Sequence, residues 1–262
     1  MIKRVLSFML MLVMSSSMSI GAAAAEAGTQ VNSPDLGNAQ YSLTEAQGYA
    51  EEEQDFKRVI DPDKPMIALT FDDGPSKYTP EVLKVLKEND SKATFFVVGS
   101  QVERFGDVLN QVIEDGNEVG NHSYNHKDLT TVSDEELYKQ VKGTDDLIYI
   151  ASGYTPTLMR TPYGKGGDEL NEKISRPVIK WSVDTRDWES RNTEMIVDEV
   201  IKNVKDGDIV LMHDLYDSTA EAAKIVIPKL VEMGYQLVTV SELSEYRDIT
   251  LTPGQQYYNM YK

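Results

Sequence analysis

The stretch that decides the fold is Ile67-Ala68-Leu69-Thr70-Phe71-Asp72-Asp73-Gly74-Pro75, an apolar run that ends in two adjacent carboxylates. A run of this kind predicts a buried strand. Neighbouring side chains on a strand point to opposite faces, so an Asp-Asp pair inside it would bury one charge at a cost of several kcal/mol. Gly74 and Pro75 end the strand at once, so both carboxylates can turn toward one centre, where a cation offsets their repulsion. The alternative is an ordinary solvated turn.

Around this strand, the chain from residue 64 onward alternates short apolar runs with helical patterns. The predicted strands are Met66–Phe71, Ala93–Val98, Glu118–Asn121, Thr157–Arg160, Val178–Val183, Asp208–Met212 and Gln236–Val240. The predicted helices are Pro80–Asn89, Gln101–Asp115, Ser133–Ile150, Thr193–Val204 and Thr219–Met233. Such a series predicts an α/β fold with a parallel sheet, which is either closed as a barrel or open and doubly wound. We expect the closed form, a (β/α) barrel with about seven parallel strands.

Residues 1–25 have the pattern of a secretory signal peptide. Lys3 and Arg4 precede an apolar run from Val5 to Val13, and small residues follow at Gly21–Ala25. The apolar run is shorter than the roughly 20 residues that a bilayer span requires, so we expect cleavage near the end of the alanine run and no transmembrane span. The protein is therefore expected to be secreted or held at the extracellular cell surface.

The rest of the chain divides into a linker, a folded domain and a tail. Residues 26–61 are polar and acidic, with the run Glu51-Glu52-Glu53, and are expected to form a flexible linker. A helix from Thr44 to Val59 is the alternative. The folded domain is expected at residues 62–247, and a tail without clear periodicity at residues 248–262.

Composition limits the partners and the chemistry. The formal charge of -17 repels phosphate backbones, so nucleic acid is not expected as a partner and a neutral substrate is. The sequence has no cysteine, which excludes disulfides, thiol nucleophiles and cysteine-bound zinc. We expect a monomer that is stabilised by one large core.

The three histidines of the chain all follow predicted strands, at the edge where the active groups of a barrel lie. A lone histidine is more often structural. Here His122 and His126 are four residues apart, and with Asp73 they can supply two imidazoles and one carboxylate to a single ion. Three protein ligands leave a position open, as in catalytic zinc sites, where the cation lowers the pKa of water and polarises a carbonyl oxygen.

Hydrolysis of an acyl group also needs a base for the water and an acid for the leaving group. Asp72, next to the candidate ligand, is the expected base, and His213 is the expected acid. Asp184 ends a neighbouring strand and is expected to raise the pKa of His213. Arg160 is expected to pair with Asp72, with an exposed loop arginine as the alternative.

Other polar and aromatic residues lie at the same edge. Asp187 and Asp214 are interpreted as solvated loop acids. The aromatic residues are candidate walls for stacking a sugar, or else they simply pack: Trp181, Trp188 and Tyr163.

Five motifs in order resemble those of the polysaccharide deacetylase family, also called carbohydrate esterase family 4 or the NodB-homology domain. They are Thr70-Phe71-Asp72-Asp73-Gly74-Pro75, His122-Ser123-Tyr124-Asn125-His126, Arg160-Thr161-Pro162-Tyr163, Asp184-Thr185-Arg186-Asp187-Trp188 and Leu211-Met212-His213. The similarity extends over residues 65–243. Each motif lies at a predicted strand end, so the set is far more specific than any one member.

The resemblance implies a distorted (β/α) barrel that holds a divalent metal and hydrolyses an acetyl group on a sugar. It implies that Asp73, His122 and His126 bind the metal, that Asp72 is the base and that His213 is the acid. It further implies that Arg160 orients the base, Asp184 tunes the acid, the backbone N–H of Tyr163 binds the oxyanion, and Leu211 lines the acetyl pocket, with Trp188 as a further substrate contact. Zn²⁺ is the expected metal, with Co²⁺, Ni²⁺ or Mn²⁺ as alternatives.

Three functions are consistent with this pattern. The first is an exported deacetylase that acts on N-acetylglucosamine residues of peptidoglycan or chitin-type oligomers. The second is an O-acetyl esterase that acts on acetylated xylan through the same metal site. The third, a glycan-binding protein without activity, is disfavoured by the complete set of candidate catalytic residues.

Overall fold

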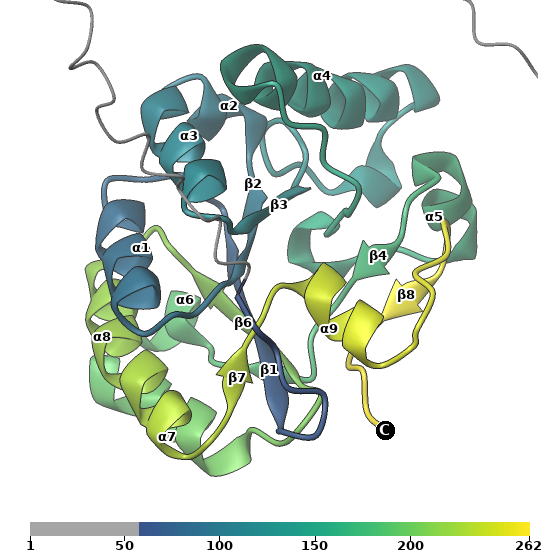
Figure 1. The fold of residues 1–262 in the computed structure, drawn as a ribbon. Helices are drawn as coiled ribbons and strands as arrows, with labels where there is room; N and C mark the ends of the chain where they lie inside the picture. The colour runs from purple at the N-terminus through teal and green to yellow at the C-terminus, as the bar shows by residue number, and fades with distance from the viewer. Residues whose placement is uncertain (1–57) are drawn as a thin grey trace, which may run out of the picture. The chain divides into compact units, whose positions relative to one another are not determined.

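The computed structural model describes residues 58–262 (Figure 1). The predicted signal peptide and the linker up to residue 57 lie outside the described residues. The last linker residues pack on the domain: Ile60 is buried, and Arg58 donates hydrogen bonds to the carbonyl of Leu237 and to Glu242. Within residues 58–262, no helix is both long and apolar enough to cross a bilayer.

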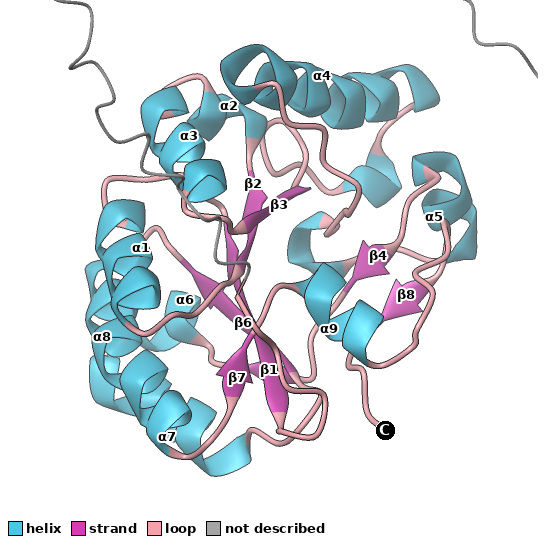
Figure 2. Cartoon of the chain, in the orientation of Figure 1, coloured by secondary structure: helices cyan, strands magenta, loops and turns pink. Residues whose placement is uncertain are grey.

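Short strands alternate with helices along the described chain (Figure 2). The strands are β1 (Met66–Asp72), β2 (Thr94–Val97), β3 (Glu118–Asn121), β4 (Val178–Ile179), β5 (Val183–Asp184), β6 (Ile209–His213), β7 (Gln236–Leu237) and β8 (Gln256–Tyr257). The α-helices are α1 (Thr79–Glu88), α2 (Gly99–Val102), α3 (Gly106–Glu114), α4 (Asp134–Ser152), α5 (Asp168–Ile174), α6 (Asp187–Ser190), α7 (Thr193–Asn203), α8 (Asp217–Glu232) and α9 (Val240–Tyr246). Two 3₁₀ turns are η1 (Leu129–Thr131) and η2 (Pro162–Gly164).

The strands form a distorted barrel, as predicted. The parallel strands follow the order β3-β2-β1-β6-β5, and β7 pairs with the first residues of β1. Single bridges join Asn121 to Met159 and Met159 to Val178, which links β3 to the β4-β8 pair. An antiparallel bridge from Asn259 to Asp208 connects the end of the chain to the start of β6. The strands therefore close on themselves, but with interruptions.

Three of the predicted strands are shorter in the structure than predicted, or are divided. The strand Thr157–Arg160 is reduced to the bridge at Met159, and Val178–Val183 is split into β4 and β5. The strand Gln236–Val240 ends early because Thr239 accepts a hydrogen bond from the Glu242 N–H in a capping box, which starts α9. In contrast, the predicted start of a helix at Ser133 is confirmed, because the Ser133 side chain accepts a hydrogen bond from the Glu136 N–H and caps α4.

The residues after 247, expected as a separate tail, belong to the barrel. They supply β8, which pairs with β4, and Met260, which is fully buried. Two strand residues are too few for a periodicity to be recognised, so the sequence of this segment does not reveal its place in the fold.

Strand β1 separates two parts of the core. Ile67, Leu69 and Phe71 pack in the cluster that the outer helices cover, and Figure 1 shows α1, α7 and α8 side by side on that face. Met66 and Ala68 pack in a second cluster with Phe96, Ile179 and Leu243. Because side chains alternate along a strand, Thr70 and Asp72 continue the face of Met66 and Ala68. The polar end of β1 is therefore directed into the barrel.

Candidate active site

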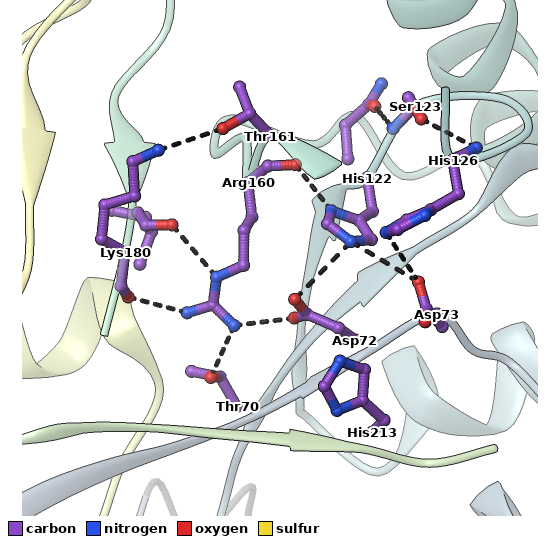
Figure 3. Close-up of polar contacts among 12 residues, drawn as sticks. Thr70, Asp72, Asp73, His122, Ser123, His126, Arg160, Thr161, Lys180 and His213 are labelled. Atoms are coloured by element: carbon purple, nitrogen blue, oxygen red, sulfur yellow. Dashed lines mark hydrogen bonds and ion pairs between the residues drawn. The ribbon is translucent and has the colours of Figure 1, made fainter. Parts of the chain in front are cut away.

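Asp72 forms a buried ion pair with Arg160 where β1 ends (Figure 3). The Arg160 guanidinium donates at 2.7 Å to Asp72 Oδ1 and at 2.7 Å to Thr70 Oγ1. Its remaining nitrogens donate to the carbonyls of Ile179 and Lys180. Burial raises the pKa of Asp72, and the charge of Arg160 opposes that rise. The alternative of an exposed loop arginine is wrong, because Arg160 is fully buried.

Asp73, His122 and His126 face one another beside this pair. Each offers one ligand atom, and these atoms lie within 4.8 Å of one another. Asp73 Oδ1 lies 3.5 Å from Nε2 of both histidines, yet it is buried without a hydrogen-bond partner. Asp73 has left strand geometry, with φ at 72°, which is how two adjacent carboxylates reach one centre.

The ring of His122 is neutral, and its Nε2 is available to bind a cation. Its Nδ1 lies 2.6 Å from the carbonyl of Arg160, so Nδ1 carries the proton and the lone pair of Nε2 faces Asp73. Burial lowers the pKa of His122 to about 3, which keeps the ring uncharged at neutral pH. An orphaned carboxylate oxygen between two imidazole nitrogens fits a divalent cation, and borderline ions such as Zn²⁺ suit this donor set.

The backbone of the second motif holds His126 in place. The N–H of His126 donates to Ser123 Oγ, and the N–H of Ser123 donates to the side chain of Asn121. Ser123 and His126 both have positive φ, at 68° and 57°. The loop thus folds back on itself so that two histidines four residues apart point to the same centre.

His213 is hydrogen-bonded to Asp187 and not to Asp184. The ring Nδ1 of His213 lies 2.8 Å from Asp187 Oδ1. The backbone N–H of His213 donates to Asp187 Oδ2 at 2.7 Å. Burial alone lowers the pKa of His213, but the hydrogen bond and charge of Asp187, together with Asp72 and Asp73, outweigh it and raise the pKa to about 9. The ring is therefore protonated at neutral pH, with Nε2–H left to donate.

The sequence predicts that Asp184 raises the pKa of His213, but the structure gives that contact to Asp187. Asp184 Oδ1 accepts the N–H of Arg186, two residues further on, so its carboxylate caps its own loop. The chain then turns into α6, which brings Asp187 back beneath His213. Asp187 is fully buried, so its interpretation as a solvated acid is wrong.

A cavity of about 470 Å³ opens over these groups. Its lining combines the polar cluster with aromatic and apolar side chains: Asp72, Asp73, His122, His126, Tyr163, Gly164, Trp181, Asp184, Trp188, Leu211 and His213. Tyr163 is the middle residue of η2 with φ at 59°, and its ring lies 4.5 Å from that of His126. The cavity therefore has a side lined by the candidate metal ligands, a side lined by the candidate acid His213, and apolar walls.

Known proteins of similar sequence identify the family of this chain. A family model described as polysaccharide deacetylase matches residues 60–177. The peptidoglycan-N-acetylmuramic acid deacetylase PdaC of Bacillus subtilis is 46% identical over 192 residues, which cover 73% of this chain and 41% of PdaC. A peptidoglycan-N-acetylglucosamine deacetylase of Bacillus cereus is 39% identical over 192 residues, covering 70% of this chain and 89% of that protein. This chain belongs to the polysaccharide deacetylase family.

Solved structures of polysaccharide deacetylases share the fold. The structure of PdaC is 47% identical with a TM-score of 0.71, covering 72% of this chain and 94% of that chain. A family 4 acetyl xylan esterase of Clostridium thermocellum, in complex with a cobalt ion, is 31% identical with a TM-score of 0.71, covering 75% of this chain and 100% of that chain. The present chain spans 41% of the length of PdaC itself.

Sequence reasoning about this polysaccharide deacetylase missed three supporting residues. Asp214 is fully buried and not solvated: it accepts from Thr79 Oγ1 and packs against Gly74, and burial raises its pKa to about 7. Thr70 shares the strand face of Asp72, so the alternation of β1 could have indicated it. Lys180 is buried and donates to Thr161 Oγ1 and to the carbonyl of Gly164, and no sequence signal marks it.

Proposed function

We propose that this protein is a divalent-metal-dependent deacetylase that hydrolyses the N-acetyl group of N-acetylglucosamine residues in peptidoglycan or chitin-type oligomers. The observation that carries the proposal is the buried, unpartnered Asp73 Oδ1 between His122 and His126, with a paired carboxylate on one side and a paired imidazole on the other. The similarity to two proteins named as peptidoglycan deacetylases supports the choice of glycan.

Asp73, His122 and His126 would hold the cation. When bound, the cation supplies Lewis acidity, which polarises a carbonyl oxygen and acidifies water. We expect Zn²⁺, with Co²⁺, Ni²⁺ or Mn²⁺ as alternatives. The acetyl xylan esterase of Clostridium thermocellum was solved in complex with a cobalt ion, which supports a divalent metal in this fold.

Asp72 acts as the general base in this proposal. Its Oδ1 is held by Arg160, while Oδ2 lies 3.6 Å from His122 Nε2 on the side of the ligand cluster. Oδ2 therefore faces the place where water would attack the acetyl carbonyl carbon. Asp72 accepts the proton of that water as the C–O bond forms, and Arg160 keeps the carboxylate from rotating away.

His213 acts as the general acid. Its ring is protonated and fixed through Nδ1 by Asp187, so Nε2–H can be given to the sugar nitrogen as the C–N bond breaks. The products are an amine and acetic acid, which ionises to acetate by releasing its proton to solvent. Asp72 then loses its proton to solvent and His213 regains one.

The cavity walls place the acetyl group. The backbone N–H of Tyr163 donates to the oxyanion, Leu211 borders the acetyl methyl, and Trp188 stacks on the sugar. Trp188 is 46% exposed, which leaves its ring available to a ligand.

An O-acetyl esterase acting on xylan is the alternative. The similarity to the family 4 acetyl xylan esterase favours it, since ester and amide hydrolysis need the same base, acid and cation. Either activity suits a secreted protein, and we propose that residues 1–25 form a signal peptide that brings the enzyme to the cell surface.

Acetate release from three substrates tests this proposal: chitotetraose, purified peptidoglycan and acetylated xylan. We expect release from the first two, loss of activity with a chelator, and recovery when Zn²⁺ or Co²⁺ is restored. Activity that survives chelation would exclude the metal mechanism. Release from xylan alone would favour the esterase, and no release from any substrate would favour a binding protein.

A further inference from the structure

Arg191 carries a guanidinium that is held beside Trp188, a residue of the cavity lining, without lining the cavity itself. It follows α6 directly, and its side chain is exposed. Its Nε donates to the carbonyl of Trp188 at 2.8 Å, and its guanidinium carbon lies 3.1 Å from the centre of the Tyr216 ring. Stacking and the hydrogen bond hold the group in one orientation, so it would lose little freedom on binding a ligand.

This position is adjacent to the acid side of the site. Trp188 lines the cavity, and the Tyr216 ring lies 6.2 Å from the ring of His213. Arg191 therefore contacts two residues that flank the proposed acid. A group bound by its terminal nitrogens would belong to a sugar in the cavity or to that sugar's neighbour.

Within residues 58–262, no carboxylate forms an ion pair with Arg191, although the chain has 43 acidic and 26 basic residues. Arg186, at the other end of α6, is also exposed and lies 3.6 Å from Glu189. Both arginines have positive φ, at 51° and 49°, a conformation that costs free energy for a residue with a side chain. Because Arg186 is paired with Glu189 and Arg191 is not paired, Arg191 is the arginine of this loop whose charge is not neutralised within the described residues.

Among the described residues, the cavity lining offers no guanidinium or ammonium group to a carboxylate of the glycan. The lining contains Asp72, Asp73 and Asp184, and no lysine or arginine of the described chain contributes to it. A carboxylate of the glycan can therefore meet a guanidinium only outside this lining, and Arg191 is placed there beside Trp188. The planar guanidinium fits a carboxylate through two parallel hydrogen bonds.

We infer that Arg191 binds a carboxylate of the glycan and makes the enzyme prefer acetamido glycans that carry one on the residue next to the reacting N-acetylglucosamine. The inference rests on the proposed deacetylase function and narrows its substrate class. The ligand is a β-linked acetamido glycan in which a carboxylate is attached through a lactyl ether or through a peptide on that ether. Neutral chitin-type oligomers lack this group.

Deacetylation kinetics of matched variants test the inference. The substrates are chitotetraose, a glycan strand of alternating N-acetylglucosamine and N-acetylmuramic acid without peptide, and the same strand with its stem peptides. For R191Q we expect kcat/KM to fall about tenfold on the strand whose carboxylate Arg191 binds, which is one of the two carboxylated strands, and to stay within about twofold on chitotetraose. R191K keeps the charge but not the planar fork, so it should fall in between.

The control is R186Q, which removes an exposed arginine from the same loop and should change neither substrate class by more than about twofold. Loss on the peptide-free strand assigns the lactyl carboxylate as the ligand, and loss only on the strand with peptides assigns a peptide carboxylate. Equal losses on neutral and carboxylated substrates, or no loss on either, would overturn the inference. Equal losses for R186Q and R191Q on the carboxylated strands would overturn it as well.

Binding measured without turnover separates this inference from the proposed function. Calorimetry compares D72N with the double variant D72N/R191Q. The double variant should bind the carboxylated strand about tenfold more weakly than D72N does, and both should bind chitotetraose equally. Identical affinities of the two proteins for the carboxylated strand would overturn the inference even if deacetylation is established. A selective loss would support it even if the wild type released no acetate.

Discussion

At the scale of single residues, the pairing of His213 with Asp187 decides the pH range of the proposed reaction. The acid must be protonated, so the rate falls as pH rises through the pKa of His213, which Asp187 helps to raise to about 9. In Asp187→Asn the carboxylate is lost while burial remains, and burial lowers the pKa of an imidazole. We expect the alkaline limb of kcat/KM to move from about pH 9 to below about pH 7.

Asp184→Asn is the matched control for that profile. Its carboxylate lines the cavity but makes its hydrogen bond to the N–H of Arg186. The alkaline limb should therefore stay near that of the wild type. If the alkaline limb moved in Asp184→Asn and not in Asp187→Asn, Asp184 would be the residue that raises the pKa of His213, as the sequence predicts.

A second pair of variants separates the cation from the base. His126→Ala removes one of the three candidate ligands, so metal content measured after dialysis should fall from about one ion per chain to near zero. Asp72→Asn keeps all three ligands but cannot accept a proton, so it should retain metal and lose at least about a hundredfold in kcat. Near-normal turnover in Asp72→Asn would refute the choice of base.

Asn125→Ala is the control for both variants, because Asn125 is an exposed residue of the same loop. It should keep both metal and turnover. Metal loss in this variant would mean that the loop, and not the His126 ring, is the sensitive element.

At the scale of elements, the short turn η2 depends on a charge buried beneath it. Lys180 Nζ donates to Thr161 Oγ1 at 3.1 Å and to the Gly164 carbonyl at 2.7 Å, so it joins the two ends of the turn that carries Tyr163. Burial lowers the pKa of Lys180 to about 8, a sign that the ammonium is costly to hold there. We therefore expect Lys180 to position the turn η2, and with it the backbone N–H of Tyr163.

Lys180→Met tests that role. Methionine fills similar space without donors, so the turn should loosen and kcat should fall about tenfold, while KM and metal affinity stay near wild type. The melting temperature should not fall, because an apolar group replaces a buried charge. The control, Lys165→Met, removes an exposed lysine that pairs with Asp128 next to the same turn. Lower melting temperature with unchanged kcat would assign Lys180 to folding alone.

At the scale of the whole described domain, the last residues complete the barrel. Met260 is fully buried, its N–H donates to the carbonyl of Gly207 at 2.7 Å, and Asn259 bridges to Asp208. Met260→Ala should therefore lower the free energy of unfolding by about 2–5 kcal/mol, as measured by urea denaturation. Tyr258→Ala, at an exposed position of the same segment, should change it by less than about 0.5 kcal/mol.

Strand β1 and the candidate ligands could be predicted because their signals are local. An apolar run that ends in Asp-Asp-Gly-Pro marks where a buried strand stops, and all three histidines lie next to such ends. The parallel arrangement then brings those ends to one edge, since every β/α unit starts its strand from the same side. The order of motifs along the chain was thus enough to indicate Asp73, His122 and His126 as one cluster.

The partner of His213 could not be predicted in this way. Asp184 and Asp187 are three residues apart in one motif, and only the turn into α6 determines which carboxylate comes back to the ring. Likewise β8 is two residues long, and Lys180 acts through contacts with residues 16 and 19 positions away. Sequence by itself determined which chemical groups reach the mouth of the barrel, because strand periodicity and strand ends are written in neighbouring residues. Only the tertiary structure decided how those groups pair, because each pairing depends on the path of a loop whose ends are set by distant strands.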